Sequence, residues 1–82
     1  MDILRRGSRG FKVQYLQRLV NKALVRDHAG GTSLTEDGAY GPLTEGALRA
    51  FQARHRPLRE DGEAGPATWG ALGLAPNENI PR

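Results

Sequence analysis

The sequence lacks cysteine altogether and has few aromatic residues: one Trp, two Tyr and two Phe among 82 residues. Without cysteine there are no disulfide bridges, thiolate nucleophiles or Cys-bound zinc sites. No apolar run approaches the roughly 20 residues that cross a bilayer, so we predict no membrane span. The first residues, MDILRR, reach charged side chains without an apolar stretch, which predicts no signal peptide.

The remaining composition is that of one small globular domain. Apolar residues make up 38% of the chain and 11 glycines add to them, so low-complexity disorder is not expected. The net charge is +3, and the basic residues gather near the start, where Asp2 is the single acid among residues 1–26. A second basic cluster comprises Arg49, Arg54, Arg56 and Arg59. Nucleic acid, an anionic membrane or an anionic cell-wall polymer would suit this charge, and so would a plain solvated face.

A first helix is predicted from about Phe11 to Leu24, because Val13, Leu16 and Val20 recur at three- and four-residue steps. Ser8 is the expected N-cap of this helix. Periodicity then disappears between residues 25 and 36, which predicts a long loop containing a Gly-Gly-Thr-Ser stretch.

The most informative feature is an internal repeat. Residues 37–48 read DGAYGPLTEGAL and residues 61–72 read DGEAGPATWGAL, with eight of twelve positions identical. The Asp-Gly pair predicts a turn that the Asp side chain holds through its own backbone. Gly-Pro places proline at the first residue of a helix, where its missing N–H costs nothing.

Each repeated unit therefore predicts a turn followed by a helix start. In the helix that follows the first repeated turn, we expect an inward face formed by Leu43, Ala47, Leu48 and Phe51. In the helix that follows the second repeated turn, we expect Trp69 and Leu72 to face inward and Gly73 to end the helix. The predicted fold class is all-α, a compact three-helix bundle with a little strand pairing from the turns. We expect residues 1–74 to form the domain and residues 75–82 to be a linker-like tail.

These motifs resemble those of a known family, the bacterial peptidoglycan-binding domains of the three-helix type, often called type 1. The resemblance rests on LRRGSRG (4–10) with the Val-x-x-Leu-Gln of 13–17, on the block 37–52, and on the block 61–72. It covers the chain from about Ile3 to Leu74. The connection 25–36 is longer than is usual in the family, and His55-Arg56-Pro57 stands where such domains often turn through glycine.

The resemblance implies non-catalytic binding of peptidoglycan, through its glycan or its stem peptide, by a module that targets an attached cell-wall hydrolase. The linker-like tail suggests that the catalytic domain follows on the C-terminal side. We expect action at the cell wall or in the periplasm. Without a signal peptide, cytoplasmic synthesis with delivery by another route is expected, as for a phage endolysin or an injected effector.

Several residues are candidate peptidoglycan contacts: Asp37, Tyr40, Thr44, Arg49, Gln52, Arg56 and Trp69. Tyr40, in a turn, is the aromatic ring expected to be exposed and able to stack on a ligand. Arg49, Arg54 and Arg56 can meet ligand carboxylates through paired hydrogen bonds, or can simply form a solvated face. For Asp37 and Gln52 we favour a role in holding loops, and for Trp69 and Phe51 a place in the core.

No catalytic or metal-binding constellation stands out, so we predict neither an enzyme nor a cofactor. Asp37 and Asp61 both lie in repeated turns, which disfavours an acid–base pair for glycoside hydrolysis. His28 and His55 lack zinc-ligand spacing, and Ser8 and Ser33 lack a nucleophile elbow.

Two other functions compete with peptidoglycan binding. In a nucleic-acid-binding domain, Lys12, Arg18, Lys22 and Arg26 would line one helix face and meet phosphates. The Ala-rich stretch 47–53 is poor for reading bases, which disfavours that function. A structural spacer is the third possibility. The prodomains of matrix metalloproteinases resemble this fold, but they block their enzyme with a cysteine that this chain lacks.

Overall fold

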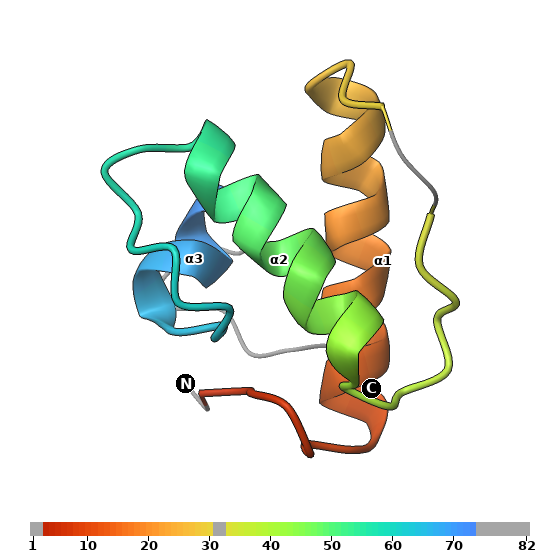
Figure 1. Cartoon of the computed structure of the whole chain (residues 1–82). Helices are drawn as coiled ribbons and strands as arrows, with labels where there is room; N and C mark the ends of the chain where they lie inside the picture. Colours follow the sequence, from red (N-terminus) through yellow and green to blue (C-terminus); the bar gives the residue numbers. More distant parts are fainter. Residues whose placement is uncertain (1–2, 31–32, 74–82) are drawn as a thin grey trace.

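The computed structural model describes residues 3–30 and 33–73, which fold into three helices (Figure 1). The helices are α1 (Phe11–Arg26), α2 (Pro42–Arg54) and α3 (Pro66–Ala71). No β-strand longer than an isolated bridge occurs in the described ranges. The predicted all-α three-helix bundle is therefore confirmed.

The helices begin where the local chemistry predicts, but the N-cap of α1 is a different residue from the one expected. Pro42 and Pro66 each occupy the first turn of their helix, as the Gly-Pro pairs indicate. The prediction that Ser8 caps α1 is wrong, because Gly10 is the N-cap and no side chain bonds there. The Ser8 hydroxyl instead accepts the N–H of Arg5 at 3.1 Å and closes a turn ahead of the helix.

Two antiparallel bridges fasten the N-terminal segment to the repeated turns. Leu4 pairs with Ala64, and Arg9 pairs with Ala39. The predicted strand pairing therefore takes the form of single bridges, one to each repeated unit. Through them, the segment before α1 holds both turns on the same side of the bundle.

The chain crosses the molecule once between α1 and α2. Residues 33–41 run back alongside α1, so α2 starts near the same end of the molecule as α1 (Figure 1). The two long helices contact each other directly. Gly73, the predicted helix stop, follows the C-cap of α3 with a φ of 109°. The predicted tail, residues 75–82, lies outside the described residues, and the domain boundary remains a prediction.

The core lies between the three helices. It contains the predicted stripe of α1, with Val13, Leu16 and Val20 fully buried. Phe51 and Trp69 are also fully buried, as expected for the largest side chains of a small core. Truncating either ring to alanine would cost about 3–5 kcal/mol.

The inward face predicted for α2 is only partly correct. Leu48 and Phe51 are fully buried, but Leu43 is 82% exposed. The buried residues of α2 are Thr44, Leu48, Phe51 and Gln52, a stripe set by contact with α1 and the second turn. Leu43 lies one residue away from that stripe, which turns its side chain outward.

Candidate functional site

A groove lies along the outer side of α2. It consists of two adjoining hollows with volumes of about 230 and 470 Å³. One wall is α2 from Pro42 to Arg54, the facing wall is the segment 33–35, and Gln17 and Leu24 of α1 contribute to the base. We call this cleft the α2 groove.

The α2 wall of the groove is formed by residues at helical spacing. Leu43, Ala47, Ala50 and Arg54 follow one another at steps of four, three and four, so they share one face. Gly46 joins them between Leu43 and Ala47. Small residues in the middle of this face leave room in the groove, while Leu43 and Arg54 stand at either end.

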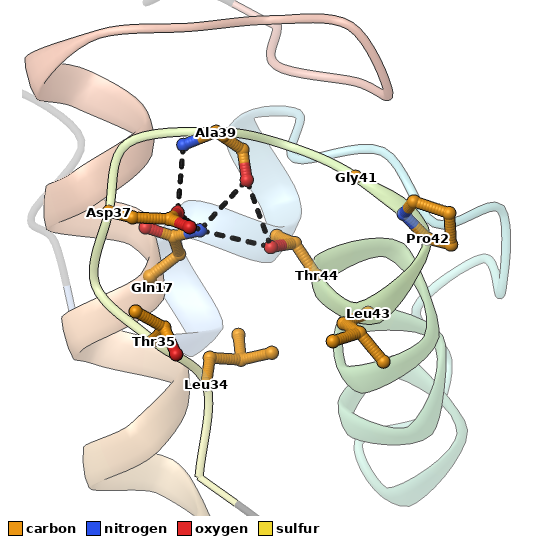
Figure 2. A pocket seen from close by; sticks show the side chains of 9 residues that line it. All are labelled: Gln17, Leu34, Thr35, Asp37, Ala39, Gly41, Pro42, Leu43 and Thr44. Atoms are coloured by element: carbon orange, nitrogen blue, oxygen red, sulfur yellow. Dashed lines mark hydrogen bonds between the residues drawn. The ribbon is translucent and has the colours of Figure 1, made fainter.

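The facing wall is positioned by an asparagine of α1. Asn21 donates from Nδ2 to the carbonyl oxygen of Leu34 at 2.9 Å, and its Oδ1 accepts the N–H of Leu34 at 2.7 Å. Gln14 donates to the carbonyl oxygen of Glu36 at 2.9 Å. These bonds hold the end of the long connection against α1, so that the Leu34 side chain faces Leu43 across the hollow (Figure 2).

The end of the groove near the start of α2 is built on a buried glutamine (Figure 2). Gln17 Nε2 lies within 3.0–3.1 Å of Asp37 Oδ1, the Ala39 carbonyl oxygen and Thr44 Oγ1. Its Oε1 accepts the N–H of Gly38 at 2.9 Å. The buried amide therefore bonds to the first repeated turn and to the start of α2, which uses both of its N–H groups.

Gly38 is required in this turn for two reasons. Its φ of +76° is a conformation that favours glycine, and a Cβ there would lie 2.9 Å from the carbonyl oxygen of Gly10. The Gly10 N–H in turn donates to the Gly38 carbonyl oxygen at 2.8 Å. The turn thus packs directly against the start of α1.

The second repeated unit has the same arrangement around Gln52. Its Nε2 lies 3.1 Å from Asp61 Oδ1, 2.9 Å from the Glu63 carbonyl oxygen and 3.2 Å from Thr68 Oγ1. The N–H of Gly62 donates to Gln52 Oε1 at 2.9 Å. The repeat in the sequence is therefore one structural device used twice, each copy docked on a glutamine of the preceding helix.

Opposite charges lie at the two ends of the α2 groove. At the first end, Asp37 is exposed, and its Oδ1 accepts the N–H of Ala39 at 3.0 Å. This bond, together with the Gln17 amide, lowers the pKa of the Asp37 carboxyl below its usual value. Asp37 is therefore an anion at neutral pH, as part of a turn that it holds itself.

At the second end, Arg54 is tied down by an acid at the end of α1. Arg54 Nε donates to Asp27 Oδ2 at 3.2 Å, and His55 Nε2 lies 2.7 Å from the same oxygen. The hydrogen bond from His55 is the main cause of the lowered pKa of Asp27, with Arg54 adding to it. These contacts fix the Arg54 guanidinium beside the groove, and 27% of the Arg54 side chain is exposed.

The structure brings together only some of the predicted contact residues. Asp37 and Thr44 line the groove, although Thr44 is buried and bonded to Gln17. The expectation that Tyr40 is exposed is wrong, since the ring is 3% exposed and its hydroxyl donates to the carbonyl oxygen of Gly62. Burial also raises the pKa of that hydroxyl.

The remaining predicted contacts lie away from the groove. Gln52 and Trp69 are fully buried, one in the second turn network and the other in the core. Arg49 and Arg56 are exposed and do not line the groove, and Arg49 Nη1 donates to the Glu60 carbonyl oxygen at 3.2 Å.

Sequence reasoning did not select Leu34 or Leu43 as site residues, and it considered Arg54 only as one of three arginines. The signal for Leu34 was the unusual length of the connection 25–36, which supplies the second wall. The described residues contain no group of three or more His, Cys, Asp or Glu side chains suited to a metal. None of the helices in the described ranges is long and apolar enough to span a membrane.

Three helices joined by two such turn units are the architecture of a class of cell-wall-binding modules. A family model that matches this chain identifies the class. The chain belongs to the family described as "Putative peptidoglycan binding domain", whose model matches residues 10–72. It is therefore a peptidoglycan-binding module acting at the bacterial cell wall, and the family is one of binding domains rather than enzymes. No curated protein matches the chain.

Solved structures of longer proteins contain a part that is similar to this chain. The endolysin of Burkholderia AP3 phage shares 44% identity with a TM-score of 0.74, over 88% of this chain and 25% of the endolysin. A fused Zn-dependent amidase/peptidase/peptidoglycan-binding domain-containing protein from Clostridium acetobutylicum ATCC 824 shares 30% identity with a TM-score of 0.75, over 94% of this chain and 31% of that protein. The chain thus spans about a quarter to a third of each.

Proposed function

We propose that this domain docks a covalently attached cell-wall hydrolase onto peptidoglycan. The observation that carries the proposal is the family match over residues 10–72. A hydrolase as the attached partner is supported by the two similar structures, an endolysin and an amidase/peptidase fusion, each of which is much longer than this chain.

Docking helps an attached enzyme by mass action. A linked catalytic domain meets its substrate at an effective concentration set by the linker, in the millimolar range for short flexible linkers. Even weak binding by the domain would therefore raise the rate at which the hydrolase cuts the wall. The placement of the catalytic domain after residue 82, and delivery from the cytoplasm by another route, belong to the same proposal. The mass and N-terminal sequence of the natural protein test both.

Co-sedimentation with purified peptidoglycan sacculi tests the proposed function. We expect the 82-residue domain to pellet with sacculi at moderate salt and to stay in solution without them. Domain that stays in the supernatant with sacculi at every salt concentration would contradict the proposal. The natural full-length protein should then lyse sacculi faster than a version from which this domain is deleted.

Duplex DNA in the same assay tests the competing function, which is nucleic-acid binding. Within the described residues, two of the basic side chains of α1 already have acidic partners: Arg18 with Glu36 at 3.3 Å, and Arg26 with Asp27 at 3.6 Å. We therefore expect weak DNA binding that disappears as salt rises, while retention on sacculi persists.

A further inference from the structure

We propose that the α2 groove binds the stem peptide of peptidoglycan, not its glycan strand, with a peptide carboxylate at Arg54 and a peptide ammonium at Asp37. The proposal rests on the proposed function and names the part of the polymer that is recognised. Three properties of the groove support it: its lining, its length and its charges.

The lining suits a peptide with small side chains. No residue that lines the groove in the described part of the chain is aromatic, so a sugar ring finds no exposed face on which to stack. Tyr40 and Trp69, the rings closest to the repeated turns in sequence, are buried. Leu34, Leu43 and Ala50 offer aliphatic surface instead, which complements the methyl groups of alanine residues.

The length of the groove matches a short extended peptide. From Pro42 to Arg54, α2 rises about 18 Å at 1.5 Å per residue. An extended peptide spans this distance with about five residues, at 3.3–3.6 Å each. A stem peptide of five residues therefore reaches from one end of the wall to the other.

The charges complement the chemistry of a stem peptide, which carries free carboxylates and the side-chain amine of its dibasic residue. Among the described residues, Arg54 has an acceptor for Nε only, which leaves both terminal nitrogens to form a fork toward a carboxylate. At the other end, Asp37 uses Oδ1 in its own turn, and Oδ2 has no donor in the described ranges. The two charges place the side-chain amine at one end of the groove and a carboxylate at the other.

Sacculi stripped of stem peptides by an amidase separate this proposal from the proposed function. We expect the domain to pellet with intact sacculi and to lose at least ten-fold in retention on the peptide-free glycan. Equal retention on both materials would overturn the stem-peptide proposal while leaving peptidoglycan binding intact. Failure to pellet with either would contradict both.

Matched variants then place the peptide in the groove. Leu43→Ser should weaken binding to intact sacculi roughly five- to ten-fold, while Val25→Ser should not, although Val25 is 78% exposed and Leu43 82%. Val25 lies on α1 and does not line the groove. Both substitutions exchange an exposed aliphatic side chain, so an equal effect of the two would overturn the proposal.

Charge variants test whether the peptide amine lies at Asp37. Asp37→Asn keeps Oδ1 for the turn but removes the charge, and should weaken binding of a synthetic stem tetrapeptide at least three-fold in a calorimetric titration. The same loss should follow when the peptide amine is acetylated, and acetylation should then have no further effect on the variant. Independent losses from the two changes would overturn the contact between Asp37 and the amine. Thermal unfolding of each variant shows whether it folds.

Discussion

The hydroxyl of Tyr40 donates a hydrogen bond to the carbonyl oxygen of Gly62, 22 residues along the chain. Tyr40 belongs to the first repeated unit and Gly62 to the turn of the second. The bond therefore joins the two units across the interior of the molecule. A tyrosine that sequence reasoning assigned to the ligand instead holds the two turns together.

Replacing Tyr40 by Phe is expected to destabilise the domain by about 1–2 kcal/mol without weakening the binding of sacculi. The Gly62 carbonyl oxygen would lose its donor in a buried position while the ring volume is kept. Denaturant unfolding measures the change. Tyr15→Phe is the control, since its half-buried ring stacks near Trp69 at 6.5 Å between centroids and its hydroxyl has no described partner. Equal stability losses in the two variants would contradict the role assigned to Tyr40.

Replacing Gln17 by Met should destabilise the domain by roughly 2–3 kcal/mol. The Gly38 N–H would be left buried without an acceptor, and the Ala39 carbonyl oxygen would lose a donor. Gln14→Met on the exposed side of α1 removes a single bond to the Glu36 carbonyl oxygen and should cost under about 1 kcal/mol. Urea titrations followed by circular dichroism compare the two, and similar midpoints would refute the proposed importance of the buried amide.

Replacing Gly46 by Ala should stabilise the fold and weaken peptide binding. Gly46 is in the middle of α2, and a Cβ there meets no atom within 4 Å, so the substitution gains about 0.5–1 kcal/mol of helix propensity. The added methyl group occupies space in the groove. Gly70→Ala in α3 has the same open surroundings but lies outside the groove, so it should leave binding unchanged. Tighter binding by the Gly46 variant would disprove this assignment of the groove.

The cluster around Asp27 predicts a pH dependence of stability. Because the folded state lowers the pKa of Asp27 below its ordinary 3.8, the carboxylate stabilises the fold above that pH. This contribution is lost as the pH falls through the lowered pKa. Asp27→Asn should therefore cost about 1 kcal/mol at neutral pH, the scale of a partly exposed hydrogen-bonded pair.

The difference in unfolding free energy between the wild type and Asp27→Asn should shrink toward zero when the pH drops well below 3.8. Thermal unfolding at a series of pH values measures it. A constant difference across the series would mean that Asp27 contributes through its shape and hydrogen-bonding pattern rather than through its charge.

Local chemistry made much of this fold predictable. Pro42 and Pro66 mark the helix starts, and Asp37 holds its turn through Ala39, because these effects operate within a few residues. The spacing of apolar residues in α1 predicts its buried face for the same reason.

Apart from the N-cap assigned to Ser8, which is a local error, the errors concern contacts between residues far apart in sequence. The exposure of Tyr40 depends on Gly62, and the orientation of Leu43 depends on which face of α2 packs against α1. The groove itself depends on Leu34, whose position is set by Asn21, 13 residues earlier. The resemblance in sequence identified the family, but it did not predict which residues contact one another across these distances.

The long connection before Leu34 is fastened at both ends independently of the two buried glutamines. The Ala29 N–H donates to the Leu24 carbonyl oxygen at 2.9 Å, and Asn21 holds Leu34. The stretch between these anchors can therefore change in length and composition without disturbing either turn network. The fold thus separates the contacts that hold its turns and helices from a surface segment that evolution is free to vary.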